Sequence, residues 1–416
     1  MQSKNINIPL SSVWVLAGSL AIIYTGFGIV LPVFPKFLQE NNAGESISLG
    51  ILIASFAIAQ IIFAPLYGRL SDRGYGRRPF ILLALFGYGM GNFLYAFFAR
   101  DLASMILVRI FEGITVAGLL PVSQALITDL TVSENRAKYL GILTGSSNVG
   151  LIIGPALGGI LFDIGGFILP FVISGILSFI ALIFAFILVP ETKRKGNVEI
   201  VHYENSDLYI HQSKWKQFRS MFVSGGVIIF FMLLIISFLD FFSWIVIEPG
   251  IIFYFYNLGF TPLEFGYFVG VYGAFVAIGQ IFFGGLSDRF GRGIIIFIGG
   301  IFHLLAYMAL SFATTFVEIL FMPVFAGIAI ALIHPALTAF VGDIVKERYR
   351  GQVIGILAIP AQFAGVIGPL FGGYFAEIYD VSYLFWLSAF LGGLISIIIL
   401  IQFLLINQKS TIESIS

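Results

Sequence analysis

The sequence contains no cysteine, and charged residues fill only 11% of its 416 positions. The absence of cysteine excludes disulfide bonds, thiol chemistry and thiolate metal sites. Charged residues make up about a quarter of an average soluble domain, so this composition excludes an ordinary soluble globular protein. The formal net charge is zero, which argues against a nucleic-acid partner because nucleic-acid-binding domains are usually basic.

Long apolar segments take up most of the chain instead, because 59% of its residues are hydrophobic. Runs of about twenty apolar residues predict membrane-spanning helices. The chain is therefore expected to be an all-α membrane protein. One long polar interruption divides it into an N-terminal half (1–189), a central loop (190–221) and a C-terminal half (222–416). Six spans are expected on each side of the loop, at 13–38, 49–68, 80–98, 103–127, 140–161, 167–189, 223–247, 265–286, 294–313, 316–341, 352–376 and 383–406.

Lysine and arginine are distributed unevenly between alternate loops. If the N-terminus is cytoplasmic, the cytoplasmic segments hold 19 of the 22 basic residues, and the outer segments hold only Lys36 and Arg100. The remaining one, Arg109, lies within a span. This pattern follows the positive-inside rule. We therefore expect a multi-pass plasma-membrane protein with both termini in the cytoplasm.

The two halves repeat each other. The loop segment 68–78 (GRLSDRGYGRR) recurs as 284–292 (GGLSDRFGR), and the first copy has one additional residue between Arg73 and Gly76. Duplicated six-helix halves are typical of secondary transporters, whose substrate site lies near the middle of the bilayer between the halves. Nine further pairs of identical residues are 214 positions apart: Gly113 and Gly327, Pro121 and Pro335, Asp129 and Asp343, Arg136 and Arg350, Gly141 and Gly355, Gly154 and Gly368, Pro155 and Pro369, Gly158 and Gly372, and Gly159 and Gly373.

The loop 68–78 resembles the signature loop of the major facilitator superfamily, and 284–292 resembles the weaker second copy in that family. The resemblance covers the whole chain through the twelve spans, the central loop and both signatures. It implies the major facilitator fold, in which two pseudo-symmetric six-helix halves alternate access to the substrate. The matching residues are Gly68, Leu70, Asp72, Arg73, Gly76, Arg77 and Arg78 in the first copy, and Gly284, Leu286, Asp288, Arg289, Gly291 and Arg292 in the second.

These loops predict a cytoplasmic gate. A carboxylate among guanidinium groups can form ion pairs or cap a helix N-terminus, and so latch one conformation. The alternative is a purely positive-inside anchor, which does not require an aspartate at the same place in both halves. The additional residue leaves the positions of Arg77 and Arg78 open. The candidate gate residues are Gly68, Asp72, Arg73, Arg77, Asp129, Arg136, Asp288, Arg289, Asp343 and Arg350.

Two charged residues lie three positions apart in the fourth span, and therefore on one helical face: Arg109 and Glu112. Charges inside a membrane are costly and suggest function. Proton-coupled members of the family commonly have an arginine at this position, so the resemblance implies a role in proton coupling. The alternative is a neutralised pair that fixes helix packing. The second half has Pro323 and Ala326 at the corresponding positions.

Asp240 lies deep in the seventh span and is a second candidate proton or cation site. The alternative is a buried acid that is hydrogen-bonded to a neighbouring helix. We interpret the single histidines His303 and His334 as packing residues rather than proton relays. The first span keeps Gly26, Gly28, Pro32 and Pro35 in the pattern of drug and tetracycline exporters, but it lacks the acid that often precedes them.

The segment 141–159 (GILTGSSNVGLIIGPALGG) is rich in helix-breaking residues although it lies in a span. Gly150, Gly154 and Gly158 form one stripe, and such small-residue stripes let helix backbones approach closely. The spacing resembles the antiporter signature of exporters, which implies a tight, bent contact with the other half that limits leakage. The alternative is generic close packing. The signature residues are Gly141, Gly150, Gly154, Pro155, Gly158 and Gly159.

These features predict a proton-coupled exporter of small amphipathic compounds such as drugs, working as a monomer without a metal or cofactor. An importer of a nutrient such as a sugar is the alternative, and the antiporter signature counts against it. A membrane enzyme or sensor is a remote alternative, since the sequence shows no nucleophile triad, phosphate loop or metal-ligand cluster. The expected substrate cavity contains Tyr24, Asn148, Asp240, Phe241 and Gln362.

Overall fold

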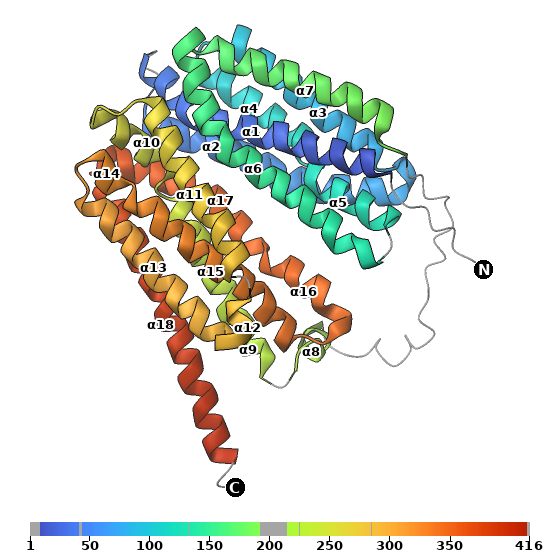
Figure 1. Ribbon diagram of the computed structural model, residues 1–416, viewed down its shortest axis with the longest axis vertical. Helices are drawn as coiled ribbons and strands as arrows, with labels where there is room; N and C mark the ends of the chain where they lie inside the picture. Colours follow the sequence, from blue (N-terminus) through green and yellow to red (C-terminus); the bar gives the residue numbers. More distant parts are fainter. Residues whose placement is uncertain are drawn as a thin grey trace. The chain divides into compact units, whose positions relative to one another are not determined.

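The computed structural model describes residues 9–40, 44–131, 133–191, 214–223, 225–283 and 285–413. These residues form helices, with one isolated β-bridge between Phe222 and Val345 (Figure 1). Within them, twelve segments are long and apolar enough to cross a membrane, as the sequence predicts. The central loop lies largely outside the described residues, which include only its first two residues, 190–191, and its last part, 214–221, with the short helix α8 (Lys214–Ser220).

The chain divides into two compact units, which are described separately. The first comprises Met1–Glu199 and Ile252–Gly270, and the second comprises Ile200–Ile251 and Val271–Ser416. Residues 252–270 therefore belong to the first unit, although they follow the central loop in the sequence. The helices of the first unit are α1 (Leu10–Glu40), α2 (Ser46–Leu70), the π-helix η1 (Ser71–Tyr75), α3 (Arg78–Phe97), α4 (Leu102–Val116), α5 (Leu119–Leu130), α6 (Ser133–Gly165) and α7 (Ile168–Leu188).

The second unit contains α8 and the other helices after the central loop. Two helices contribute to both units, α10 (Glu248–Asn257) and α11 (Pro262–Phe283). The remaining elements are α9 (Gly226–Ile245), α12 (Leu286–Phe290), α13 (Arg292–Phe312), α14 (Phe316–Ile319), α15 (Phe321–Ile344), the 3-10 helix η3 (Glu347–Tyr349), α16 (Arg350–Leu357), α17 (Ile359–Ile378) and α18 (Ser382–Glu413).

The repeat extends to the turns that start the fourth and tenth spans. Asp101 caps α4 because its carboxylate accepts the backbone N–H of Ser104 over 2.8 Å, and the Ser104 hydroxyl completes a capping box. These hydrogen bonds hold the pKa of Asp101 below its usual value. Thr315 and Glu318, at the corresponding positions 214 residues later, form the capping box of α14. Both spans therefore start from the same local structure.

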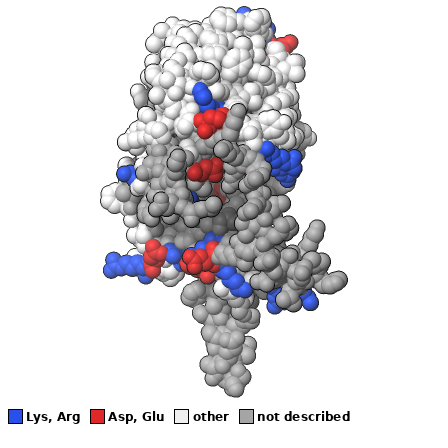
Figure 2. All heavy atoms as spheres, turned by 90° about the vertical axis from the view of Figure 1, so that its right-hand side faces the viewer, with Lys and Arg blue, Asp and Glu red and all other residues white. Residues whose placement is uncertain are grey.

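Each unit has its own apolar core. Fully buried Leu16, Leu85 and Leu126 bring together α1, α3 and α5 in the first unit, and Leu233 and Ile296 join α9 and α13 in the second. Much of the remaining apolar surface is exposed, as expected where lipid is the solvent. On the face shown in Figure 2, large areas carry no charged side chain, and the acidic and basic side chains gather in small groups.

Candidate functional site

Arg77 is the centre of a charged cluster in the first unit. Its Nη2 lies 2.6 Å from Oδ1 of Asp72 and its Nε lies 3.1 Å from Oδ2 of Asp129. Its Nη1 donates a hydrogen bond to the hydroxyl of Ser71 over 2.6 Å. The residue is only 5% exposed. One guanidinium therefore ties the loop that follows α2 to the end of α5, which a planar group with five N–H donors can do.

Arg292 forms the same cluster in the second unit. Its Nη1 lies 2.5 Å from Oδ1 of Asp288 and 2.7 Å from the hydroxyl of Ser287. Its Nε lies 3.0 Å from Oδ2 of Asp343 at the end of α15. The two units thus repeat a serine, two aspartates and an arginine in one arrangement.

The additional residue of the first loop is accommodated by a kink within η1 (Ser71–Tyr75), where the backbone of Gly74 is not helical. Beyond this kink, Arg77 has the same place in its cluster that Arg292 has in the second loop. Gly74 has a φ of +106° within this turn, which strongly favours glycine. The sequence left the position of Arg77 open, and the structure shows that it is equivalent to the position of Arg292.

The other predicted gate arginines have different partners. Arg73 makes no ion pair within the part of the chain that the structure describes, and Arg289 lies 5.6 Å from the ring centre of Phe290. Neither joins the aspartate cluster that the sequence predicted for it. A Cβ at Gly68 would meet no atom within 4 Å, so no close contact requires glycine at this gate position.

Arg136 and Arg350 extend the clusters through the backbone rather than through ion pairs with the aspartates. Arg136 Nη2 donates to the carbonyl of Thr128 over 3.3 Å, and Arg350 Nε donates to the carbonyl of Gly342 over 3.0 Å. Each carbonyl belongs to the residue before the cluster's second aspartate. A guanidinium at this place neutralises the negative end of the helix.

Arg109 and Glu112 form a buried ion pair on α4. Arg109 Nη1 lies 3.2 Å from Glu112 Oε2, and the two residues are 4% and 1% exposed. The guanidinium Nε is buried without a hydrogen-bond partner among the described residues. Aromatic rings surround it instead and offer their negative faces to the cation. The distances from the guanidinium carbon to the ring centres are 5.9 Å for Phe27, 4.7 Å for Phe34, 5.6 Å for Phe56 and 5.8 Å for Tyr95.

Two glycines provide the space for this pair and its surroundings. A Cβ at Gly91 on α3 would lie 2.5 Å from Cγ of Glu112, and a Cβ at Gly26 on α1 would overlap the hydroxyl of Tyr88. Glycine at both positions is therefore required by close packing around the buried charges.

Asp240 is buried on α9 between two histidines. Its Oδ2 lies 2.9 Å from Nε2 of His334 on α15, with hydrogen-bond geometry. Its Oδ1 lies 3.2 Å from Nδ1 of His303 on α13. On the far side of the His303 ring, Nε2 lies 3.3 Å from the hydroxyl of Ser243 and 3.2 Å from that of Tyr307. Three helices thus meet at one carboxylate, and His334 is the only one of these three ionisable side chains with substantial exposure, at 47%.

The five predicted cavity residues fall into both units. In the first, Tyr24 on α1 is half-buried and Asn148 on α6 is exposed. In the second, Phe241 is half-buried beside the buried Asp240 on α9, and Gln362 on α17 is exposed. Asn148 faces away from the buried Gly150, as its helical position predicts.

The glycine stripe of α6 packs against α1, whereas the expected contact with the C-terminal half (222–416) is made by the Ala156–Gly159 end of the signature. A Cβ at Gly150 would overlap the backbone of α1 at Ala21, and one at Gly158 would lie 2.8 Å from Cα of Ile29. The two helices run side by side (Figure 1). The two backbones can approach closely because α1 also has a glycine at the contact, Gly28, directly opposite Gly154.

The two ends of the signature behave differently from the stripe. A Cβ at Gly159 would lie 2.9 Å from the backbone nitrogen of Leu263, whereas a Cβ at Gly141 would meet nothing within 4 Å. Ala156, next to Pro155, packs against Gly266 of α11. A Cβ added at Gly266 would lie 2.7 Å from the Cα of Ala156. Residues 262–266 form the start of α11 and belong to the first unit. Helix α6 therefore contacts both α1 and the start of α11.

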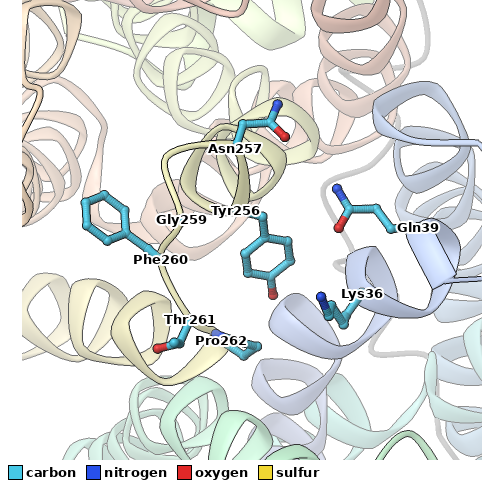
Figure 3. Close-up of a pocket in the computed structure, with 8 residues that line it drawn as sticks. All are labelled: Lys36, Gln39, Tyr256, Asn257, Gly259, Phe260, Thr261 and Pro262. Carbon is cyan, nitrogen blue, oxygen red and sulfur yellow. The ribbon is translucent and has the colours of Figure 1, made fainter.

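A cavity of about 380 Å³ lies in the first unit where the end of α1 meets the connection from α10 to α11. Tyr256 stands at its centre (Figure 3) and donates a hydrogen bond to the carbonyl of Pro32 over 2.7 Å. The Nζ of Lys36 lies 6.0 Å from the Tyr256 ring centre. The lining residues are Lys36, Gln39, Tyr256, Asn257, Gly259, Phe260, Thr261 and Pro262.

Sequence reasoning missed several of these partners. Ser71 and Ser287 are identical in both loop copies, and that repetition was a signal for their shared role. Nothing in the sequence indicated that His303 and His334 share one carboxylate, because 63 to 94 residues separate them from Asp240. The Tyr256 cavity had no sequence signal.

Comparisons with known proteins agree with the fold. A model described as Major Facilitator Superfamily matches residues 16–246 and 233–414. The chain is 32% identical over 371 residues to tetracycline resistance protein class B of Escherichia coli, which covers 87% of this chain and 86% of that protein. It is 28% identical over 399 residues to multidrug resistance protein 1 of Bacillus subtilis, covering 93% and 94% of the two chains.

A solved structure supports the same conclusion for the fold alone. The inward-facing, unoccupied crystal structure of a bacterial homolog of the human lysosomal transporter Spinster aligns with a TM-score of 0.72 at 18% identity, over 96% of both chains. The predicted twelve-span fold is confirmed. The chain is a membrane protein that belongs to the major facilitator superfamily.

Proposed function

We propose that this protein is a proton-coupled exporter of small amphipathic compounds, including drugs. One observation carries the proposal: relatives named for tetracycline and multidrug resistance match about nine-tenths of the chain, at 28% to 32% identity. The antiporter signature at 141–159 supports the same direction of transport. The protein works as a monomer in the plasma membrane, with both termini in the cytoplasm.

Transport proceeds by alternating access. When the carrier opens to the cytoplasm, substrate enters a cavity lined by residues such as Tyr24, Asn148 and Gln362. A proton from outside then binds a buried acid, either Glu112 or Asp240, and returns the carrier to the cytoplasm-facing state. Both acids are at most 1% exposed, so protonation changes the charge where water cannot screen it.

The Arg77 and Arg292 clusters act as the two parts of the cytoplasmic gate. Each ties the loop between two spans to the end of a third helix, α5 or α15. Each loop and the helix end it contacts therefore move as one body. An arginine with three polar partners makes that connection rigid.

Transport in reconstituted vesicles tests the proposal. Ethidium, a permanently charged lipophilic cation, and tetracycline serve as probes in proteoliposomes with an imposed pH gradient. We expect both probes to move opposite to the protons, and the movement to stop when nigericin collapses the gradient. Movement that ignores the gradient, or that follows the protons, contradicts an antiporter. Protein-free liposomes provide the control for passive redistribution of tetracycline.

A further inference from the structure

We propose that Asp240, His303 and His334 form a single proton-binding unit that His334 connects to the surroundings, while Arg109 and Glu112 remain a fixed ion pair. The inference rests on the proposed proton coupling and decides which of the two buried acids carries the proton. It also replaces the interpretation of the two histidines as packing residues.

The geometry around Asp240 allows a proton to be shared. Oδ2 is hydrogen-bonded to Nε2 of His334 over 2.9 Å, and a proton can move along this bond. Oδ1 lies 3.2 Å from Nδ1 of His303, within ion-pair distance but without hydrogen-bond geometry. Imidazole both accepts and donates protons near neutral pH. Groups that interact this closely titrate as a unit rather than one by one.

His334 is the residue through which the proton arrives. Its side chain is 47% exposed, whereas those of Asp240 and His303 are 2% and 0% exposed. A proton that binds Nδ1 of His334 allows Nε2 to release its own proton along the hydrogen bond to Oδ2 of Asp240. The bond from hydrogen to Nε2 breaks as the bond to Oδ2 forms, and the ring returns to its neutral form.

Few other groups influence this carboxylate. Among the described residues, the neighbouring titratable groups are Tyr272 on α11 and Tyr307 on α13. From α9 itself only the Ser243 hydroxyl joins, through the ring of His303. The ionisable groups acting on Asp240 are the two histidines, without a lysine or arginine among them. Its charge is therefore balanced only by groups that can themselves lose a proton.

The Arg109 and Glu112 pair lacks this property. Arginine stays protonated under all relevant conditions, and the charged or aromatic partners of Arg109 among the described residues are Glu112 and the surrounding rings. Protonation of Glu112 would remove the carboxylate partner of the buried Arg109 cation and leave it only aromatic faces, which is unfavourable. The pair is accordingly suited to hold α4 in place rather than to exchange protons.

Histidine NMR tests the proposal without any substrate. The chain has four histidines, so selective labelling of the full-length protein in detergent gives four ring signals, which His303→Gln and His334→Gln assign. We expect His303→Gln and Asp240→Asn to change the pH at which the His334 signal shifts. Glu112→Gln should leave that signal unchanged. A His334 signal that does not respond to His303→Gln and Asp240→Asn, or a response to Glu112→Gln of the size seen with Asp240→Asn, overturns the proposal.

Chemical rescue provides a second test in proteoliposomes with ethidium. We expect His334→Ala to slow gradient-driven transport about tenfold, and added imidazole to restore most of the rate, because the exposed position admits a small base. His303→Ala, at a fully buried position, should not be rescued. Thr338→Val, one turn further along the exposed face of α15, should behave like the wild type.

The two tests separate the inference from the proposed function. If the wild type responds to the gradient and His334→Ala does so at the same rate, His334 is not the connection and only this inference fails. If the wild type ignores the gradient, the proposed function fails, and the NMR titration still decides whether the three residues form one proton-binding unit.

Discussion

Arg77 reaches Asp129, 52 positions further along the chain, over 3.1 Å, and Arg292 reaches Asp343 in the same way over 3.0 Å. The same contact thus closes the corresponding loop in both units. Because the two loops differ by one residue, the contact itself, rather than the loop length, is what the duplicated halves share.

A positive charge at position 77 should not be sufficient to hold the cluster together, because the planar guanidinium makes three separate contacts. Arg77→Lys keeps one positive charge but cannot contact Ser71, Asp72 and Asp129 together. We expect it to lower the free energy of unfolding by about 1–2 kcal/mol, because the partners are partly exposed. Thermal unfolding in detergent, followed by tryptophan fluorescence, measures this. Arg73→Lys is the matched control in the same loop and should unfold like the wild type; equal losses would show that Arg77 has no special place.

The additional residue of the first loop should be dispensable. Deleting Gly74 gives the sequence SDRYGR, which has the spacing of SDRFGR in the second loop. We expect this variant to keep the Arg77 cluster and to transport the probes at close to the wild-type rate. Gly74→Ala should be worse than the deletion, by about 1–2 kcal/mol in stability, since its φ of +106° strains a residue with a side chain. A deletion variant that is less stable than Gly74→Ala would contradict the equivalence of the two loops.

The glycine stripe is predicted to matter where α1 is close, and only there. A Cβ at Gly154 would lie 2.6 Å from Cα of Gly28, so Gly154→Ala should lower stability by about 1–3 kcal/mol through overpacking. Gly145→Ala has open space around its Cβ and should change stability by less than about 1 kcal/mol. Thermal unfolding of both variants makes the comparison. Similar effects at the two positions would mean that helix propensity, rather than contact with α1, determines the outcome.

Removing one member of the Arg109 and Glu112 pair should lower the free energy of unfolding more than replacing both members. Glu112→Gln leaves a buried cation and should lower stability by about 3 kcal/mol. Replacing both residues, by Arg109→Met with Glu112→Met, should cost less than Glu112→Gln alone. We also expect the double variant, where it unfolds like a native protein, to keep gradient-driven ethidium transport. Additive losses in stability, or transport that no longer responds to the gradient, would contradict a fixed pair.

Sequence patterns were sufficient for the architecture because spanning helices must satisfy their own backbone hydrogen bonds. Twenty apolar residues therefore specify a span, and the structure confirms the twelve that were predicted. The loop clusters could also be predicted, since Asp72 recurs as Asp288 and Asp129 recurs as Asp343. Which arginine joins each cluster was harder to predict: Arg289 was expected in the second cluster, but Arg292 occupies it.

Side-chain partners across helices could not be predicted. Periodicity gives the face of a helix but not the neighbour of that face, so the contact of the Gly150 stripe with α1 was not predicted. The meeting of Asp240 with His303 and His334 depends on how three helices pack in the second unit. No local pattern in the sequence encodes that packing.

Ethidium uptake into proteoliposomes with an acidic interior tests the central claim most directly, since ethidium is permanently charged and a pH gradient alone does not concentrate it. Export coupled to protons predicts that ethidium accumulates while protons leave, that nigericin abolishes accumulation, and that Asp240→Asn removes the dependence on the gradient. Uptake at the same rate with and without the gradient, or only with the gradient reversed, would contradict the account.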